Sequence, residues 1–253
     1  MPENPPPGDF YIGYRSKAPD ALARFLKARV LVLLLAAAGF AALLAATQGS
    51  FDPGTFEFGE YQTLSGTLRE RPVPLLEVER PGGGEPSRYP LIPFGKSGAE
   101  AAVAGLDGRA VTLEGAFLYR ENLTFVELSG AGIEATGEAE RAEAVPRDGD
   151  RPTLRGEIVD SKCFLGTMKP GRRKPHRACA QLCIRGGMPP LFVLEGTDGS
   201  TFSYLLTGPE GEAIHQQILD RVAEPVEITG QIRRLGDLWI LAADPGAIRR
   251  LKG

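Results

Sequence analysis

Side chains suited to soft-metal or redox chemistry are scarce in this sequence. Among 253 residues there are three cysteines, two histidines and three methionines. An odd number of cysteines excludes complete disulfide pairing within one chain, so at least one thiol is left for a metal, for redox chemistry or for another chain. The sequence contains no Cys-x-x-Cys-His motif for covalent haem and no standard zinc-finger spacing.

Recognisable catalytic motifs are also missing. There is no Gly-x-Ser-x-Gly motif, no phosphate-binding loop and no carboxylate pair that spacing alone identifies. The sequence therefore gives an enzymatic function no support. The single tryptophan, Trp239, and the acidic segment of residues 51–150 (nine basic against eighteen acidic side chains) argue against a nucleic-acid partner. Residues 151–253 carry a small positive excess, so we expect two lobes of opposite charge.

Charge is absent from Val30 to Phe51, and this stretch is rich in Val, Leu, Ala and Phe. It is long enough for a helix that crosses a bilayer, and we predict a transmembrane helix over residues 30–50. A cleaved signal peptide and a buried helix are the alternatives; the long polar segment before it and the lack of a small-x-small cleavage site favour an anchor. No basic residue follows before Arg69, whereas five precede it: Arg15, Lys17, Arg24, Lys27 and Arg29.

This asymmetry predicts the orientation of the span. By the positive-inside rule, residues 1–29 form a cytosolic segment and everything after residue 50 lies outside. In a bacterium, the chain would be a single-pass protein of the inner membrane with its carboxyl-terminal part in the periplasm.

The part after the span contains an internal similarity. Residues 110–128 align with residues 225–243 at a constant offset of 115, and the same offset places Leu76 on Leu191 and Tyr89 on Tyr204. It also places the helix-like stretch 97–106 on 212–221. Such self-similarity indicates a duplication.

Each copy has the pattern of three strands, a helix and two strands, which is the order of the OB-fold. We therefore predict a mainly β protein with two tandem OB-like β-barrels, over residues 51–129 and 152–253, joined by a linker at 130–151. Residues 63–68 match residues 153–158 at an offset of only 90, so the second copy has an insertion after its first strand. In this fold, that connection is one of the usual binding loops.

The insertion, residues 160–187, contains all three cysteines and one histidine. If residues 177–184 form a helix, Cys179 and Cys183 share a face at positions i and i+4, and His176 lies one turn earlier. With Cys163 these donors suit zinc or copper, and Asp160 can orient the ring of His176. The alternatives are a disulfide from Cys163 to Cys179 or Cys183, and a thiol-disulfide oxidoreductase that uses Cys179 and Cys183.

A run of basic residues lies in the same insertion. It can lower thiol pKa values or dock an anion, such as a lipid headgroup or an acidic partner surface; a solvated loop is the simpler alternative. The run consists of Lys169, Arg172, Arg173, Lys174 and Arg177.

The second copy resembles a family of small exported bacterial OB-like domains without an established function. The resemblance covers about residues 152–243 and depends on the motifs GEIVDSKC and HRACAQLCIRGG, including Asp160, Ser161, Cys163 and His176. The loop between Cys163 and His176 is longer here than in short members of the family. The resemblance implies an extracytoplasmic β-barrel and a shared Cys/His cluster.

Together these features predict a non-catalytic accessory protein. A membrane anchor beside a soft-ligand site suits a subunit or assembly factor of a membrane redox or metal-handling system. Its expected partners are the membrane and other membrane or periplasmic subunits, and its expected cofactor is a zinc or copper ion.

Overall fold

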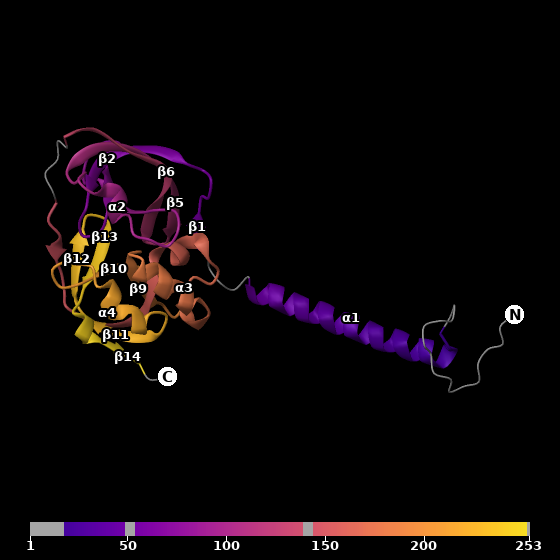
Figure 1. Ribbon diagram of the computed structural model, residues 1–253. Helices are drawn as coiled ribbons and strands as arrows, with labels where there is room; N and C mark the ends of the chain where they lie inside the picture. The colour runs from indigo at the N-terminus through magenta and orange to yellow at the C-terminus, as the bar shows by residue number, and fades with distance from the viewer. Residues whose placement is uncertain (1–17, 49–53, 139–143, 252–253) are drawn as a thin grey trace. The chain divides into compact units, whose positions relative to one another are not determined.

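A computed structural model describes residues 18–48, 54–138 and 144–251. The chain forms two compact units, Met1–Asp52 and Pro53–Gly253. The described part of the first unit is the helix α1 (Asp20–Gln48), drawn in indigo in Figure 1. It begins ten residues before the predicted span, and most of the predicted cytosolic segment, residues 1–17, lies outside the described residues.

Helix α1 is long and apolar enough to cross a membrane once. None of its described side chains is buried within the protein. Leu33, Leu35 and Phe40 are among the most exposed apolar residues of the described chain. A helix that packs in a soluble core would bury one of its faces. By length and composition, α1 fits a membrane span or a signal sequence.

The second unit is mainly β. Its first half contains a closed ring of five strands, in which β2 pairs with β3, β3 with β4, β4 with β6, β6 with β5, and β5 with β2. Only the β4–β6 pairing is parallel. The elements of this half are β1 (Thr55–Phe56), β2 (Gln62–Arg69), β3 (Leu75–Val78), β4 (Ser87–Ile92), α2 (Glu100–Val103), β5 (Arg109–Arg120) and β6 (Leu123–Glu138). We call this the first ring.

The second half repeats this order of neighbours. Strand β8 pairs with β9, β9 with β10, β10 in parallel with β13, β13 with β12, and β11 with β8. Because only Gly230 separates β11 from β12, these two strands together close a second ring. The strands are β7 (Arg147–Asp148), β8 (Thr153–Asp160), β9 (Pro190–Glu195), β10 (Thr201–Thr207), β11 (Pro225–Thr229), β12 (Gln231–Leu235), β13 (Leu238–Ala242) and β14 (Ile248–Arg250). Its helical segments are η1 (Cys163–Thr167), α3 (Arg173–Arg185), α4 (His215–Ile218), η2 (Leu219–Arg221) and η3 (Pro245–Ala247).

Strand registers in the two rings can be compared directly. Gly66 lies opposite Val111 in the first ring, and Gly156 lies opposite Val226 in the second. The helices α2 and α4 begin and end at positions that differ by 115. The first strands thus correspond at the predicted offset of 90, and the elements from the third strand onwards correspond at the predicted offset of 115; one strand is an exception.

The exception is the second strand of each ring. Leu76 lies opposite Tyr89, whereas Phe192 lies opposite Tyr204. Phe192, not Leu191, is thus the structural counterpart of Leu76, and the predicted alignment of Leu76 with Leu191 is wrong by one residue. The cause is the hairpin between these strands, which is one residue longer in the first ring.

The predicted linker is also partly strand. Strand β6 continues to Glu138, where it still pairs with Arg109 of β5, so the first ring extends into residues 130–138. Strand β7 then pairs with β12, so Asp148 lies opposite Arg233 and belongs to the second ring. Residues 139–143 lie outside the described residues.

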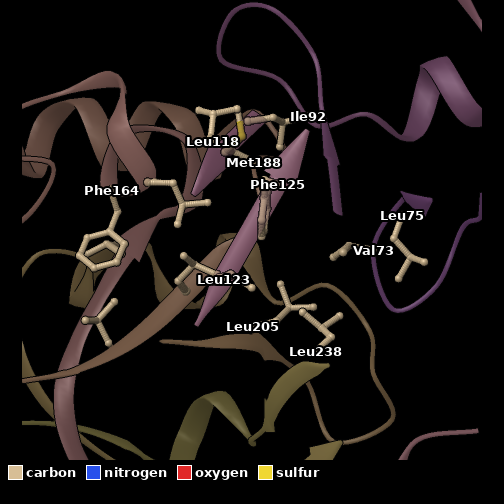
Figure 2. Close-up of a cluster of buried hydrophobic side chains, with 14 of the residues drawn as sticks. Val73, Leu75, Ile92, Leu118, Leu123, Phe125, Phe164, Met188, Leu205 and Leu238 are labelled. Atoms are coloured by element: carbon tan, nitrogen blue, oxygen red, sulfur yellow. The ribbon is translucent and has the colours of Figure 1, made fainter. Parts of the chain in front are cut away.

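The two rings share a hydrophobic core. Neighbouring residues of one strand point to opposite faces and so enter different clusters. Leu91 of β4 and Val126 of β6 pack within the first ring. The adjacent Ile92 and Phe125 pack into a cluster that also contains Leu205 of the second ring. Figure 2 shows this shared cluster, to which Val73, Leu75 and Leu118 contribute from one ring and Phe164, Met188 and Leu238 from the other. Because each ring covers an apolar face of the other, the pair forms one compact unit.

Candidate metal centre

The predicted insertion connects β8 to β9. It leaves β8 at Asp160, whose Oδ1 accepts a hydrogen bond from the backbone N–H of Cys163 at 2.9 Å and so caps the turn into η1. Gly166, with φ of +155°, lies within η1 against the backbone of Thr55 in β1. A Cβ there would lie 2.7 Å from the Thr55 carbonyl carbon, so a larger residue cannot take its place without a shift. Helix α3 then includes the predicted helix over 177–184 and begins four residues earlier.

The three cysteines come together at this turn and helix. Their sulfur atoms lie within 4.8 Å of one another. Cys163 and Cys183 are buried, and Cys179 is partly exposed. All three are free thiols. The disulfide considered from the sequence is thus not formed in this structure, and the three sulfur atoms are close enough to surround one metal ion.

The pKa values of the two buried thiols, Cys163 and Cys183, are shifted in opposite directions. The hydrogen bond to Cys183, burial and the negative charge of Asp160 raise the pKa of the Cys163 thiol. The same hydrogen bond lowers the pKa of Cys183, and the positive charge of Lys96 acts in the same direction, whereas burial and Asp160 oppose both effects. The pKa of Cys183 is therefore the lower of the two.

His176 does not join the three thiols as a single group of four. Its Nε2 lies 2.9 Å from Oδ2 of Asp160, and both side chains are buried, at 3% and 0% exposure. Asp160, Cys163 and His176 form a second group of donors that shares only Cys163 with the thiol cluster. Asp160 thus contacts His176 and also bonds the turn after β8, the two roles that its position in the sequence allows. The predicted four-ligand set is instead divided into two groups that meet at Cys163.

Lys96, which no sequence motif selects, contacts the thiol cluster from the other ring. Its Nζ lies 2.8 Å from Sγ of Cys179. The hydrogen bond to Cys179 is the main cause of the raised pKa of Lys96, and the three cysteines add to it through their charge. Lys96 lies in the segment between β4 and α2, 83 residues from Cys179. Only the packing of the two rings brings the two side chains together.

The segment that carries Lys96 is fixed in place by neighbouring contacts. We call it the cap segment, residues 93–98. The Nζ of the buried Lys162 donates to the carbonyls of Pro93 at 3.1 Å and Gly95 at 3.2 Å. It also forms an ion pair with the buried Glu127 of β6.

A second anchor lies at the carboxyl end of α3. The N–H of Gly98 donates to the carbonyl of Gly186 at 2.9 Å. A Cβ at Gly186 would lie 2.0 Å from the carbonyl oxygen of Lys96, so this close approach requires glycine. The cap segment is therefore held from both sides, by Lys162 before Lys96 and by Gly186 after it.

The basic run of the insertion is mostly engaged within the chain. Arg172 and Arg173 both pair with Glu195, at 3.1 and 2.9 Å. Arg177 pairs with Glu224. Lys169 and Lys174 are exposed.

These pairings weaken the anion-docking interpretation. Arg172, Arg173 and Lys174 line a groove of about 590 Å³, but Glu157 and Glu195 line it as well. The carboxylates offset much of the positive charge that an anion would need. The lysine that acts on the cysteine pair is Lys96, which lies outside this run.

Comparisons of the chain with models of protein families, with characterised proteins and with solved structures find no match. The functional interpretation therefore depends on the chemistry of the site itself, which gathers three free thiols around one point.

Proposed function

We propose that this chain is a membrane-anchored accessory protein that binds one zinc or copper ion through Cys163, Cys179 and Cys183. The observation that carries the proposal is the convergence of three free thiols within 4.8 Å, from the turn after a strand and from one face of a helix. Thiolate sulfur is the preferred protein ligand of zinc and Cu(I).

The arrangement is suited to a cation because of how its charges are distributed. Three thiolates at this separation repel one another in a mostly buried site, and a bound cation removes that repulsion. Without a metal, the raised pKa of Cys163 favours its neutral thiol, which lowers the repulsion. Metal binding at this site is therefore expected to release protons and to strengthen as the pH rises.

Asp160 and His176 are proposed to support the site from outside the thiol cluster. Asp160 accepts hydrogen bonds from the Cys163 backbone and from the His176 ring, so one carboxylate fixes both the turn and the start of the helix. Groups of this kind orient metal ligands and typically change metal affinity by about 10- to 100-fold when removed.

We further propose that the two rings are OB-like barrels derived by duplication. The shared order of neighbours, the equivalent glycines Gly66 and Gly156, and the equivalent helices α2 and α4 support this. The resemblance of residues 152–243 to exported OB-like domains is a separate argument from the sequence. On this proposal, the thiol cluster lies in the connection after the first strand of the second barrel, where such barrels commonly bind ligands.

The proposed location is the bacterial inner membrane, with the two rings in the periplasm. The apolar helix α1 and the basic residues before it, including Arg24, Lys27 and Arg29, support this orientation. An oxidising compartment favours disulfides over free thiols. A bound metal would protect the three thiols there.

The proposed role is that of a subunit or assembly factor of a membrane redox or metal-handling system. Large apolar side chains are exposed in the segments that form the site. Phe94 of the cap segment is 74% exposed and Leu182, between two of the cysteines, is 52% exposed. Exposed apolar side chains beside a ligand site are suited to contact with another protein subunit.

The test is elemental analysis and thiol alkylation of the full-length protein purified in detergent. We expect one metal ion per chain and three thiols that become reactive only after chelation. Cys179→Ser and Cys183→Ser should each lose the stoichiometric metal, whereas the control His215→Gln, which changes a histidine of α4, should retain it. A metal-free protein with three thiols that react without chelation would contradict the proposal.

The hydrogen-bonded pair Cys163 and Cys183 supports a second candidate function, thiol-disulfide exchange. The lowered pKa of Cys183 is the specific observation in its favour. In this case Cys179, the accessible thiol, would attack a partner disulfide and Cys183 would resolve the mixed disulfide. A disulfide-reductase assay distinguishes the two functions. Thiol-disulfide exchange requires Cys183, and a tightly bound metal inhibits it.

A further inference from the structure

The number of donors around the thiol cluster bears on which ion it takes. In the described part of the chain, only Cys163 has a histidine or carboxylate donor grouped with it, and that group is Asp160 and His176. These two residues bind each other at 2.9 Å with both side chains buried. Because Nε2 of His176 is engaged by Asp160, only its Nδ1 is left as a ligand atom, and the ring is grouped with Cys163 but not with Cys179 or Cys183.

Lys96, an exposed residue, lies at the open side of the cluster. Of the three cysteines only Cys179 is partly exposed, and Lys96 lies 2.8 Å from its sulfur. A lysine ammonium has three donor hydrogens and no lone pair, so it can hydrogen-bond to a thiolate but cannot bind a metal. Lys96 therefore contacts the accessible sulfur of Cys179 without adding a ligand.

We propose that the cluster is a three-coordinate site for a soft monovalent cation of the Cu(I) class, and that Lys96 closes the fourth ligand direction against a tetrahedral divalent ion. This inference rests on the proposed function and specifies its ion. Cu(I) is stable with three thiolates, whereas structural Zn²⁺ requires a fourth donor. Three thiolates and a monovalent cation leave an excess of negative charge, which the ammonium of Lys96 partly offsets.

The position of Lys96 is built into the fold. The carbonyls on its amino-terminal side are held by Lys162, which is itself held by the buried carboxylate of Glu127. On the other side, Gly98 is bonded to Gly186 at the end of the cysteine helix. A flexible surface lysine would have none of these constraints on its backbone. The first ring thus supplies a specificity-determining residue to a site whose ligands all come from the second.

The test uses the full-length protein in detergent, loaded separately with Cu(I) and with Zn²⁺ and examined by X-ray absorption. We expect Cu(I) bound by three sulfur atoms and no nitrogen. Zn²⁺ should bind weakly and without a nitrogen ligand, so that a chelator removes it readily.

The informative variant is Lys96→His, which places a donor where the ammonium was. We expect at least about a tenfold gain in Zn²⁺ affinity and a new nitrogen ligand in the zinc spectrum. The matched control is Lys174→His, which adds the same side chain at an exposed position near the start of α3, the helix that carries Cys179 and Cys183. It should change neither the Zn²⁺ affinity nor the zinc spectrum.

Two results would overturn the inference while leaving the proposed function intact. One is a wild-type zinc site with three sulfur atoms and an imidazole nitrogen that disappears in His176→Gln. The other is equal Zn²⁺ affinity in the Lys96→His and Lys174→His variants. If the wild-type protein takes up neither ion, the proposed function itself is refuted.

Discussion

The ion pair between Lys162 and Glu127 offers the sharpest test of how the two rings are joined. The side chains are 8% and 1% exposed, and the pair connects the start of η1 to strand β6 of the first ring. Lys162→Met would leave the carboxylate of Glu127 buried without its cation. Breaking a buried ion pair from one side costs about 3–5 kcal/mol of folding free energy.

The reverse substitution should cost less. In Glu127→Leu, the ammonium of Lys162 keeps its hydrogen bonds to the carbonyls of Pro93 and Gly95. The double variant removes both charges, and buried ion pairs replaced by apolar side chains are often neutral or stabilising. We therefore expect the double variant to lie within about 1 kcal/mol of the wild type, with strong coupling between the two positions.

Urea unfolding of the full-length protein in detergent measures these differences. The single tryptophan, Trp239 of β13, reports on the second ring by fluorescence. Arg147→Met is the control, because its ion pair with Glu85 is 84% and 58% exposed and should contribute less than about 1 kcal/mol. A loss below about 1 kcal/mol for Lys162→Met, or a double variant no more stable than the single one, would refute the reasoning.

Three further predictions follow from the fold. Burial lowers the pKa of His215 below its usual 6.5, and the charge of Glu100 opposes this shift. The unfolded chain therefore binds more protons than the folded one, and the free energy of unfolding should fall as the pH drops below about 6.5. His215→Gln should flatten this dependence in unfolding measured from pH 7.5 to 5.5. Gly156→Ala places a Cβ 2.3 Å from the carbonyl oxygen of Val193 and should cost about 1–3 kcal/mol, whereas Gly137→Ala, with open space around its Cβ, should not destabilise. Leu205→Ala should cost about 2–5 kcal/mol and lower a single unfolding transition of both rings, since they share this core; two separate transitions would contradict the shared core.

Much of the candidate site follows from local sequence. Cys179 and Cys183 are one helical turn apart, so their shared face depends only on helix geometry, and α3 confirms it. The contact between Asp160 and His176 could also be considered from the sequence, because a carboxylate at a strand end and a nearby histidine lie on one short insertion. What spacing could not decide was whether His176 faces the thiols or Asp160, since both are within its reach along the chain.

The apolar helix α1, the mainly β composition and the order of strands were determined by the sequence itself. These features depend on hydrophobic periodicity and turn residues, which act over a few positions of the chain. The one-residue error between Leu76 and Leu191 shows the limit of such patterns, because two adjacent apolar residues do not reveal which one faces the ring interior.

The tertiary structure alone decided how the two rings are combined. Lys96 reaches Cys179 across 83 residues, and Lys162 meets Glu127 across the boundary between the rings. Neither contact leaves a local pattern in the sequence, because each depends on the packing of two apolar faces that both rings bury together. The sequence thus contained the thiols of the site, and the packing of the rings supplied the lysine that covers them.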